Sequence, residues 1–322
     1  MRILIIRLSA IGDIFHAFTV ARDLREKFPK ATIDWLVDEK FENIVKLCTD
    51  IDNVISIPFK KWKKKPLSLI QNLLEFKRNL KQKGNRYDFI LEAHGLLKPA
   101  LFAKFLFKGE IYGLDSKSAN DGFFASVFYD KKFKVSRDNV AIVRFRELAS
   151  KAFNTNIKKP YQISISSEVK DIDIKDYILL LHGTSKDSKK LSQENWQAIT
   201  RYILKNTNKN ILVTYTNEEE KQLCDSLKVF LNDSRFVVLD TLEFKDFISV
   251  VEKADLVLGV DTGFVHLANL FNKRVIGVYK DSNPNYGGLL ESKIAKNLDY
   301  RCKAVNIEEI NENVAELIKV SD

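Results

Sequence analysis

Apolar positions in the first half of the chain fall into short runs that alternate with longer segments of helical spacing. Such short runs are typical of buried strands, and here they lie at residues 3–7, 32–37, 54–57 and 87–92. Apolar residues at helical spacing predict helices at residues 14–28, 67–80, 98–106 and 139–152. Strands separated by helices of this length predict a parallel sheet with right-handed crossovers.

The same alternation restarts after a polar segment at 154–174, which we interpret as a linker between domains. Strands are predicted at residues 177–181, 210–215, 236–239, 256–260 and 274–279. Helices are predicted at residues 193–204, 218–230, 245–252, 263–271 and 307–320. The sequence therefore predicts two doubly wound α/β domains, 1–165 and 166–322, with the last helix packing back on the N-terminal domain. Ligands of such sheets bind at the carboxyl ends of the strands.

Charge is divided unequally between the two halves. Residues 1–160 carry 31 Lys and Arg against 18 Asp and Glu, a net of +13, whereas residues 161–322 have a net of −4. We therefore expect the N-terminal half to meet an anionic partner. Three widely spaced cysteines without metal-ligand spacing, and no apolar run of the ~20 residues that span a bilayer, favour a reduced protein that is cytoplasmic or peripheral to a membrane.

The first candidate site joins the first predicted strand to the first predicted helix. It contains Ser9, Gly12 and Asp13, with His16 one turn further on. Asp13 either caps the helix or acts in catalysis, and the spacing leaves both interpretations open. A dinucleotide-binding G-x-G-x-x-G pattern is absent from the chain, which argues against an NAD-type oxidoreductase.

Two further segments lie at strand ends in the second half. Asp261, Thr262 and Gly263 open a helix, with His266 one turn on, and a helix start binds phosphate through its N–H groups. The alternative is a capping Asp with a structural His. The loop at 182–190 offers hydroxyls and three lysines to a diphosphate, or is simply an exposed basic loop.

The N-terminal half also contains a strongly basic segment, in which five lysines surround Trp62 at residues 60–65. Lysines around a Trp suit a membrane interface or a glycolipid head group. RNA binding is the competing interpretation, but no nucleic-acid-binding motif accompanies the segment. Other candidates for the same half are His94, Lys98, Arg144 and Arg146, and a structural role is the alternative for each of them.

Taken in order, these motifs resemble bacterial lipopolysaccharide heptosyltransferase I, of the ADP-heptose:lipopolysaccharide heptosyltransferase family. The resemblance rests on five segments, RLSAIGDIFH, FKKWKKK, EAHGLLK, HGTSKDSKK and VDTGFVH. It implies a GT-B fold, in which two Rossmann-like domains face a central cleft. It also implies an inverting transferase that moves heptose from ADP-L-glycero-β-D-manno-heptose to Kdo of Kdo-lipid A.

The resemblance also implies roles for individual residues. Asp13 resembles the general base, and Lys189 the lysine on the donor phosphates. The other residues implied on the donor side are Thr184, Ser185, Glu218, Leu242, Asp261, Thr262, Gly263 and His266. The candidates on the acceptor side are Ser9, Gly12, Lys60, Lys61, Lys63, Lys64, His94, Lys98, Arg144 and Arg146. Three positions depart from the family pattern, namely Thr19, Leu191 and Asn120.

We therefore expect an ADP-sugar donor and a lipid-anchored anionic saccharide acceptor, with peripheral contact at the cytoplasmic face of the inner membrane. No acidic cluster with Mg²⁺ spacing is evident, so we expect no metal or other cofactor in the chemistry. Nucleic acid is not an expected partner. The alternatives are heptosyltransferase II, another ADP-sugar transferase, or a non-enzymatic binder of anionic lipid or RNA.

Overall fold

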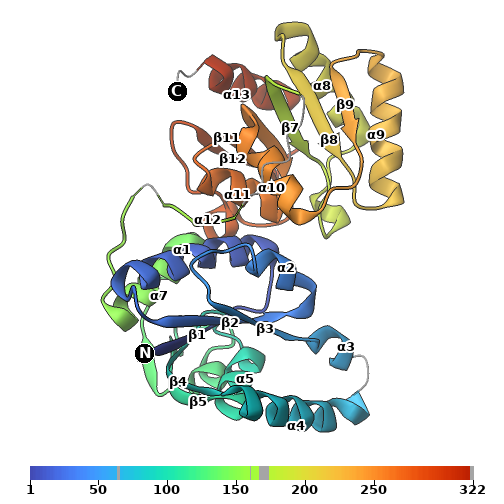
Figure 1. Cartoon of the computed structure of the whole chain (residues 1–322). Coiled ribbons are helices and arrows are strands. Elements are labelled where there is room, and N and C mark those ends of the chain that lie inside the picture. Colours follow the sequence, from blue (N-terminus) through green and yellow to red (C-terminus); the bar gives the residue numbers. More distant parts are fainter. Residues whose placement is uncertain (64–65, 160, 167–173, 320–322) are drawn as a thin grey trace. The chain divides into compact units, whose positions relative to one another are not determined.

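The computed structural model describes residues 1–63, 66–159, 161–166 and 174–319, and divides into two compact units, Met1–Ser166 and Ser167–Asp322. The sequence placed the boundary at 165/166, one residue earlier. Each unit is described separately below (Figure 1).

The N-terminal unit is built on a six-stranded parallel sheet in the order β3-β2-β1-β4-β5-β6. Its strands are β1 (Arg2–Ile6), β2 (Thr32–Asp38), β3 (Asn53–Ile57), β4 (Arg86–Glu92), β5 (Lys108–Leu114) and β6 (Lys131–Phe133). Its helices are α1 (Ile11–Lys27), α2 (Glu42–Val45), α3 (Phe59–Lys63), α4 (Pro66–Lys83), α5 (Leu97–Leu106), α6 (Phe123–Ser126) and α7 (Ala141–Phe153), with the 3-10 turn η1 (Glu39–Phe41).

Helices cover both faces of this sheet. In Figure 1, α1 and α7 lie together on one face, and α4 and α5 lie on the other. The four apolar residues at 3–6 on β1 are fully buried between these layers, as the continuous apolar run predicts for a central parallel strand. Trp35 of β2 is fully buried as well, and its indole N–H donates to the carbonyl of Arg7 (3.0 Å).

The C-terminal unit repeats this plan, with a parallel sheet in the order β12-β11-β10-β7-β8-β9. Its strands are β7 (Tyr177–Leu181), β8 (Asn210–Thr214), β9 (Phe236–Leu239), β10 (Leu256–Val260), β11 (Arg274–Tyr279) and β12 (Ala295–Asp299). Its helices are α8 (Gln193–Asn206), α9 (Glu218–Leu231), α10 (Phe244–Lys253), α11 (Gly263–Leu270), α12 (Pro284–Gly287) and α13 (Ile307–Lys319), with the 3-10 turn η2 (Asp187–Lys189).

The last helix corrects one expectation. The sequence led us to expect that residues 307–320 pack back on the N-terminal domain, but α13 packs against α8 of the C-terminal unit. Its residues Ile310, Val314 and Leu317 are fully buried in that unit's own core. The spacing of three or four residues between them forms one apolar stripe, and α8 offers the complementary surface.

Both sheets have the strand order of a dinucleotide-binding fold, so each has one point where the order reverses. We call that point the switch point of the sheet. It lies between β1 and β4 in the N-terminal unit, and between β7 and β10 in the C-terminal unit. The loops that leave neighbouring strands there diverge to opposite faces, which opens a crevice for a ligand.

Candidate active site

The N-terminal switch point contains a buried arginine that holds Asp13. Arg7 follows β1 and is 6% exposed, and its guanidinium donates to the Asp13 carboxylate. It also donates to the carbonyls of Ala93 (2.7 Å) and Ser9 (3.0 Å), and it stacks on the ring of Phe145 at 4.5 Å. These contacts fix the direction from which Arg7 meets the carboxylate.

Asp13 does not cap its helix. The N-cap of α1 is Ala10, and Gly12 and Asp13 lie in the first turn of the helix itself. The Asp13 side chain remains 33% exposed although Arg7 beside it is buried. The capping interpretation is therefore wrong, and the carboxylate is both oriented by Arg7 and open to solvent.

The end of β4 forms the second wall of this switch point. Glu92 is fully buried and accepts hydrogen bonds from the backbone N–H groups of His94 (2.8 Å) and Gly95 (2.9 Å) and from the Tyr129 hydroxyl. Burial raises the pKa of Glu92 to about 7, although these hydrogen bonds act in the opposite direction.

His94 lies beneath the site instead of at its surface. It is 5% exposed, and its Nε2 accepts the backbone N–H of Leu8 at 2.6 Å. Burial, followed by the nearby charge of Arg7, holds the pKa of His94 well below its usual range. The sequence placed His94 among the acceptor-binding residues, but the structure gives this neutral ring the task of joining the loops after β1 and β4.

Two arginines predicted for the acceptor side point to different places. Arg144 of α7 has a pKa lowered first by burial and then by the charges of Arg137 and Arg7, so it belongs to the cationic group around Asp13. Arg146 is only 3% exposed and makes a two-pronged ion pair with Asp23 of α1, at 2.5 and 2.7 Å. At 100° per residue, positions 144 and 146 face about 200° apart, so Arg146 stabilises helix packing and is not an acceptor residue.

The basic segment adjoins the end of β4 through aromatic contacts. Phe59 of α3 packs edge-on against Phe102 of α5 (5.1 Å), and the Lys98 ammonium lies 5.6 Å from the Phe59 ring. Lys61 is 75% exposed and pairs with Glu39 at 2.9 Å. The side chains of Lys60 and Lys63, and all of Lys64, lie outside the described residues.

The C-terminal switch point is centred on Asp261, which follows β10. Its carboxylate accepts from Lys189 of η2 (2.6 Å) and from the Ser282 hydroxyl, and it lies 3.9 Å from Nε2 of His266. Burial alone would raise the pKa of Asp261, but hydrogen bonds from His266, Lys189 and Ser282 outweigh it and hold that pKa well below its usual range. Asp261 is therefore a fixed negative charge that orients Lys189.

The start of α11 lies next to this carboxylate. Thr262 is the N-cap, and its side chain makes no capping hydrogen bond to the helix, which begins at Gly263. The alternative interpretation, in which Asp261 caps the helix, is therefore wrong. Thr184, in the loop after β7, donates its hydroxyl to the carbonyl of Asp261 at 2.9 Å and so joins the loops at both strand ends. Ser185 is exposed on the same loop.

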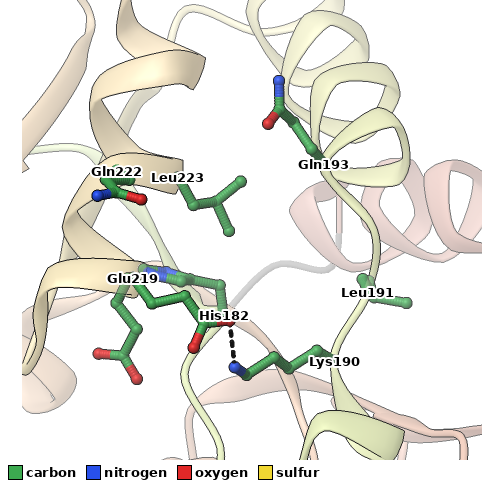
Figure 2. Close-up of a pocket in the computed structure, with 8 residues that line it drawn as sticks. His182, Lys190, Leu191, Gln193, Glu219, Gln222 and Leu223 are labelled. Atoms are coloured by element: carbon green, nitrogen blue, oxygen red, sulfur yellow. Dashed lines mark hydrogen bonds and ion pairs between the residues drawn. The ribbon is translucent and has the colours of Figure 1, made fainter.

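A pocket of about 300 Å³ lies between the loop after β7 and the start of α9 (Figure 2). Its lining residues are His182, Lys190, Leu191, Gln193, Glu219, Glu220, Gln222 and Leu223. Figure 2 shows the Lys190 ammonium reaching across it to Glu219, at 2.6 Å. Of the other predicted donor residues, Glu218 is exposed at the start of α9, and Leu242 is half-buried between β9 and α10.

Three residues that our sequence interpretation missed take part in these sites. Arg7 lies inside the segment that carried Asp13, and its charge at the end of an apolar strand is the signal that could have found it. Ser282 follows β11, so the rule that ligands bind at strand ends would have included it. Arg137, which donates to the carbonyl of Ala119, lies in a polar loop without any such signal.

The three residues that depart from the family pattern are each buried or hydrogen-bonded. Thr19 is fully buried in α1 and donates its hydroxyl to the carbonyl of His16 at 2.6 Å. Leu191 is 5% exposed in the core of the C-terminal unit. Asn120 donates to the carbonyl of His94 (2.8 Å), so it supports the acceptor-side loop through its amide.

A comparison with protein families decides the assignment. A family model described as glycosyltransferase family 9 (heptosyltransferase) matches residues 73–314. The chain belongs to glycosyltransferase family 9. This family 9 protein is therefore a glycosyltransferase, and the oxidoreductase and non-enzymatic alternatives are excluded.

Curated relatives cover nearly the whole family 9 chain. Lipopolysaccharide heptosyltransferase 1 of Salmonella typhimurium is 27% identical over 92% of this chain and 93% of its own length. The protein of the same name from Escherichia coli K12 is 28% identical over 89% and 90%, and that from Campylobacter coli is 25% identical over 97% and 93%. These relatives confirm the resemblance to heptosyltransferase I.

Solved structures confirm the GT-B fold of the family 9 enzyme. E. coli heptosyltransferase WaaC with ADP has a TM-score of 0.84 at 23% identity, over 98% of this chain and 100% of that chain. E. coli ADP-heptose lps heptosyltransferase II has a TM-score of 0.72 at 14% identity, over 99% and 98%. Within the described residues, no helix is long and apolar enough to cross a membrane.

Proposed function

We propose that this family 9 enzyme transfers L-glycero-D-manno-heptose from ADP-heptose to Kdo of Kdo-lipid A, the first heptose of the lipopolysaccharide inner core. The observation that carries the proposal is the full-length similarity to proteins named lipopolysaccharide heptosyltransferase 1. A partly exposed carboxylate at one switch point, and a Lys189–Asp261 pair at the other, support it.

On the acceptor side, Asp13 acts as the general base. Its carboxylate takes the proton from the acceptor hydroxyl as that oxygen attacks the anomeric carbon of heptose. ADP leaves from the opposite face of the sugar, so the anomeric configuration inverts. Arg144 supports binding of an anionic acceptor, because its Nε is buried and has no hydrogen-bond partner among the described residues. Ser9 and Gly12 line the approach to Asp13.

On the donor side, Lys189 neutralises the charge that develops on the departing ADP. Asp261 keeps this ammonium in place, and the Thr262 hydroxyl and the first N–H groups of α11 bind phosphate oxygens. Thr184 and Ser185 contact the diphosphate from the loop after β7, and His266 supports Asp261. Glu218 then meets the ribose, and Leu242 the adenine.

The proposed reaction requires no metal. Lys189 and the first N–H groups of α11 supply the positive charge that a divalent cation supplies to a leaving diphosphate in other enzymes. Within the described residues there is no group of three or more His, Cys, Asp or Glu side chains arranged to hold a metal ion. The test is full activity after exhaustive chelation with EDTA, and a requirement for added Mg²⁺ would contradict the proposal.

The proposed acceptor is anchored in lipid, so the enzyme works in peripheral contact with the cytoplasmic face of the inner membrane. The net charge of +13 on residues 1–160 supports this placement, because both the acceptor and the membrane surface are anionic. Lys61 and Lys98, together with Lys60, Lys63 and Lys64, contact acceptor phosphates and carboxylates.

Release of ADP tests the proposed function. We expect release only when ADP-heptose and Kdo-lipid A are both present, and little release with ADP-glucose or GDP-mannose. Release that requires an acceptor already carrying one heptose would instead assign the enzyme to the second transfer. Absence of release with every heptose acceptor would contradict the proposal.

A further inference from the structure

Apolar side chains gather on the surface of α5 and α6 in the N-terminal unit. Phe123 and Phe124 are each 68% exposed, Phe105 is 57% exposed, and Val127 is 43% exposed. The rings of Phe123 and Phe124 lie 6.3 Å apart, and α6 packs against α5. Burial of exposed aromatic rings is strongly favourable, so a surface that presents this many of them indicates a binding function. We call these four residues the α5–α6 apolar surface.

This surface is attached to the strand end that forms the acceptor side. The backbone N–H of Leu97 donates to the Asp121 carboxylate (2.7 Å), and the N–H of Asp121 donates to the carbonyl of Gly95 (2.9 Å). Gly122 follows with a φ of +56°, a conformation that L side chains rarely adopt, and the chain turns there into α6. The exposed rings thus begin two residues after an anchor to the loop that also holds His94.

The charge around the surface selects one kind of partner. Residues 97–134 contain seven lysines and four acidic residues, a net of +3. All four acidic side chains are already engaged. Asp121 accepts from Leu97, and Asp130 accepts from Ile111 (2.9 Å) and Lys104 (3.3 Å). Glu110 accepts from Tyr112 (2.9 Å) and pairs with Lys131, and Asp115 accepts from Ser118 (2.8 Å). Exposed aromatic residues among lysines fit the interface of an anionic bilayer, where the rings enter the acyl boundary and the lysines meet head groups.

We propose that the α5–α6 apolar surface docks on an anionic phospholipid bilayer, with Phe123 and Phe124 inserted. The purpose of this docking rests on the proposed function. Docking brings the membrane to the carboxyl ends of the strands, which is the end of the sheet where Asp13 lies. A lipid-anchored saccharide then reaches the base without leaving the bilayer. A second copy of the chain fits less well, because two surfaces of the same positive charge repel each other.

The test compares wild type with the double variant Phe123→Ser/Phe124→Ser. Both side chains are largely exposed, so the fold should tolerate the change. Val229→Ser is the matched control, because Val229 is 81% exposed on α9 of the other unit. The probes are vesicles of phosphatidylcholine with phosphatidylglycerol, with and without embedded acceptor, and a deacylated acceptor in solution.

We expect the double variant to bind anionic vesicles at least about tenfold more weakly, since it loses the burial of two aromatic rings in the acyl boundary. Transfer to embedded acceptor should fall with it, whereas transfer to deacylated acceptor stays at the wild-type rate. Val229→Ser should behave as wild type throughout. Unchanged vesicle binding by the double variant would overturn the proposal, as would a wild-type dimer that the substitutions dissociate. A different outcome separates the two proposals. If wild type transfers heptose to neither acceptor, and the double variant loses vesicle binding, the docking surface is supported and the proposed function is rejected.

Discussion

At the scale of single residues, both switch points place a carboxylate against a cation. The pairs serve opposite purposes. Arg7 is buried and Asp13 is 33% exposed, so the open member is the carboxylate, which suits removal of a proton. In the other pair both members are largely buried, with Lys189 16% and Asp261 11% exposed. There the carboxylate orients an ammonium, which suits neutralisation of a leaving diphosphate.

Asp13→Asn tests the first pair. The amide cannot accept the proton, so we expect kcat to fall by about 10²–10⁴, the usual contribution of a general base. Binding of ADP should not change, because Asp13 belongs to the N-terminal unit and the proposed donor residues belong to the C-terminal unit. ADP release and calorimetric titration measure the two quantities. Asp88→Asn is the control, because Asp88 is an exposed carboxylate of the same unit. Near-normal turnover of Asp13→Asn would contradict the assignment of the base.

Lys189→Ala tests the second pair. Loss of a charged hydrogen bond to phosphate typically costs about 1.5–3 kcal/mol, so ADP should bind roughly tenfold to a hundredfold more weakly. Lys186→Ala is the matched control, because Lys186 is on the same loop but is 65% exposed and pairs with Asp281. Calorimetric titration with ADP measures both variants. Equal losses in the two would show that the loop acts only through its overall charge.

Glu92 predicts a pH dependence of stability. Its pKa is raised from 4.5 to about 7, so the folded state retains a proton that the unfolded state has lost. This contribution is fully present below about pH 4.5 and is lost as pH rises to about 7, by on the order of 3 kcal/mol. Urea denaturation from pH 5 to 8 should therefore show a smaller decline for Glu92→Gln than for wild type. Identical slopes would mean that Glu92 titrates normally.

At the scale of elements, the strand order determines which loops meet. β1 neighbours β4, and β7 neighbours β10, although each pair is far apart in the sequence. The loops after these strands therefore bring Arg7 next to Ala93 and Thr184 next to Asp261. Within α7, the position of each residue around the helix decides what its side chain meets. Arg144 faces the group around Asp13, whereas Arg146 faces Asp23.

The basic segment is the element whose function is most directly testable. Replacing Lys61, Lys63, Lys64 and Lys65 with Gln should raise the acceptor KM and leave the donor KM unchanged, because the segment lies on the acceptor unit. Screening by salt should shrink the difference from wild type. The control replaces the exposed lysines Lys205, Lys228 and Lys293 of the donor unit. A similar rise in both KM values would contradict an acceptor role.

Much of this fold follows from patterns visible in the sequence, because buried central strands such as β1 and β10 are continuous apolar runs. Three strands, β5, β6 and β12, escaped prediction, because their apolar runs are short or interrupted. β5 begins with Lys-Gly-Glu, β6 has two lysines among its three residues, and β12 is mostly polar. Among site residues, Asp13, Lys189 and Asp261 lie at strand ends, which made them recognisable. The partners of His94 and Arg146 did not follow from the sequence, since Leu8 and Asp23 are distant along the chain and contribute through tertiary packing.

At the scale of the whole molecule, the two halves differ both in net charge and in proposed ligand. The half with a net charge of +13 carries the proposed base, the basic segment and the α5–α6 apolar surface. The half with a net charge of −4 nevertheless has an anionic nucleotide as its proposed ligand. Donor binding therefore depends on local groups such as Lys189 and the start of α11, whereas net charge acts on the acceptor and the membrane.

Mass spectrometry of Kdo-lipid A after incubation with the enzyme and ADP-heptose tests the proposed heptose transfer most directly. With wild type we expect an acceptor that has gained one heptosyl residue. With Asp13→Asn we expect an unchanged acceptor under conditions where that variant still binds ADP. An unmodified acceptor with wild type would contradict the proposed transfer, and the same gain with Asp13→Asn would contradict the assignment of the base.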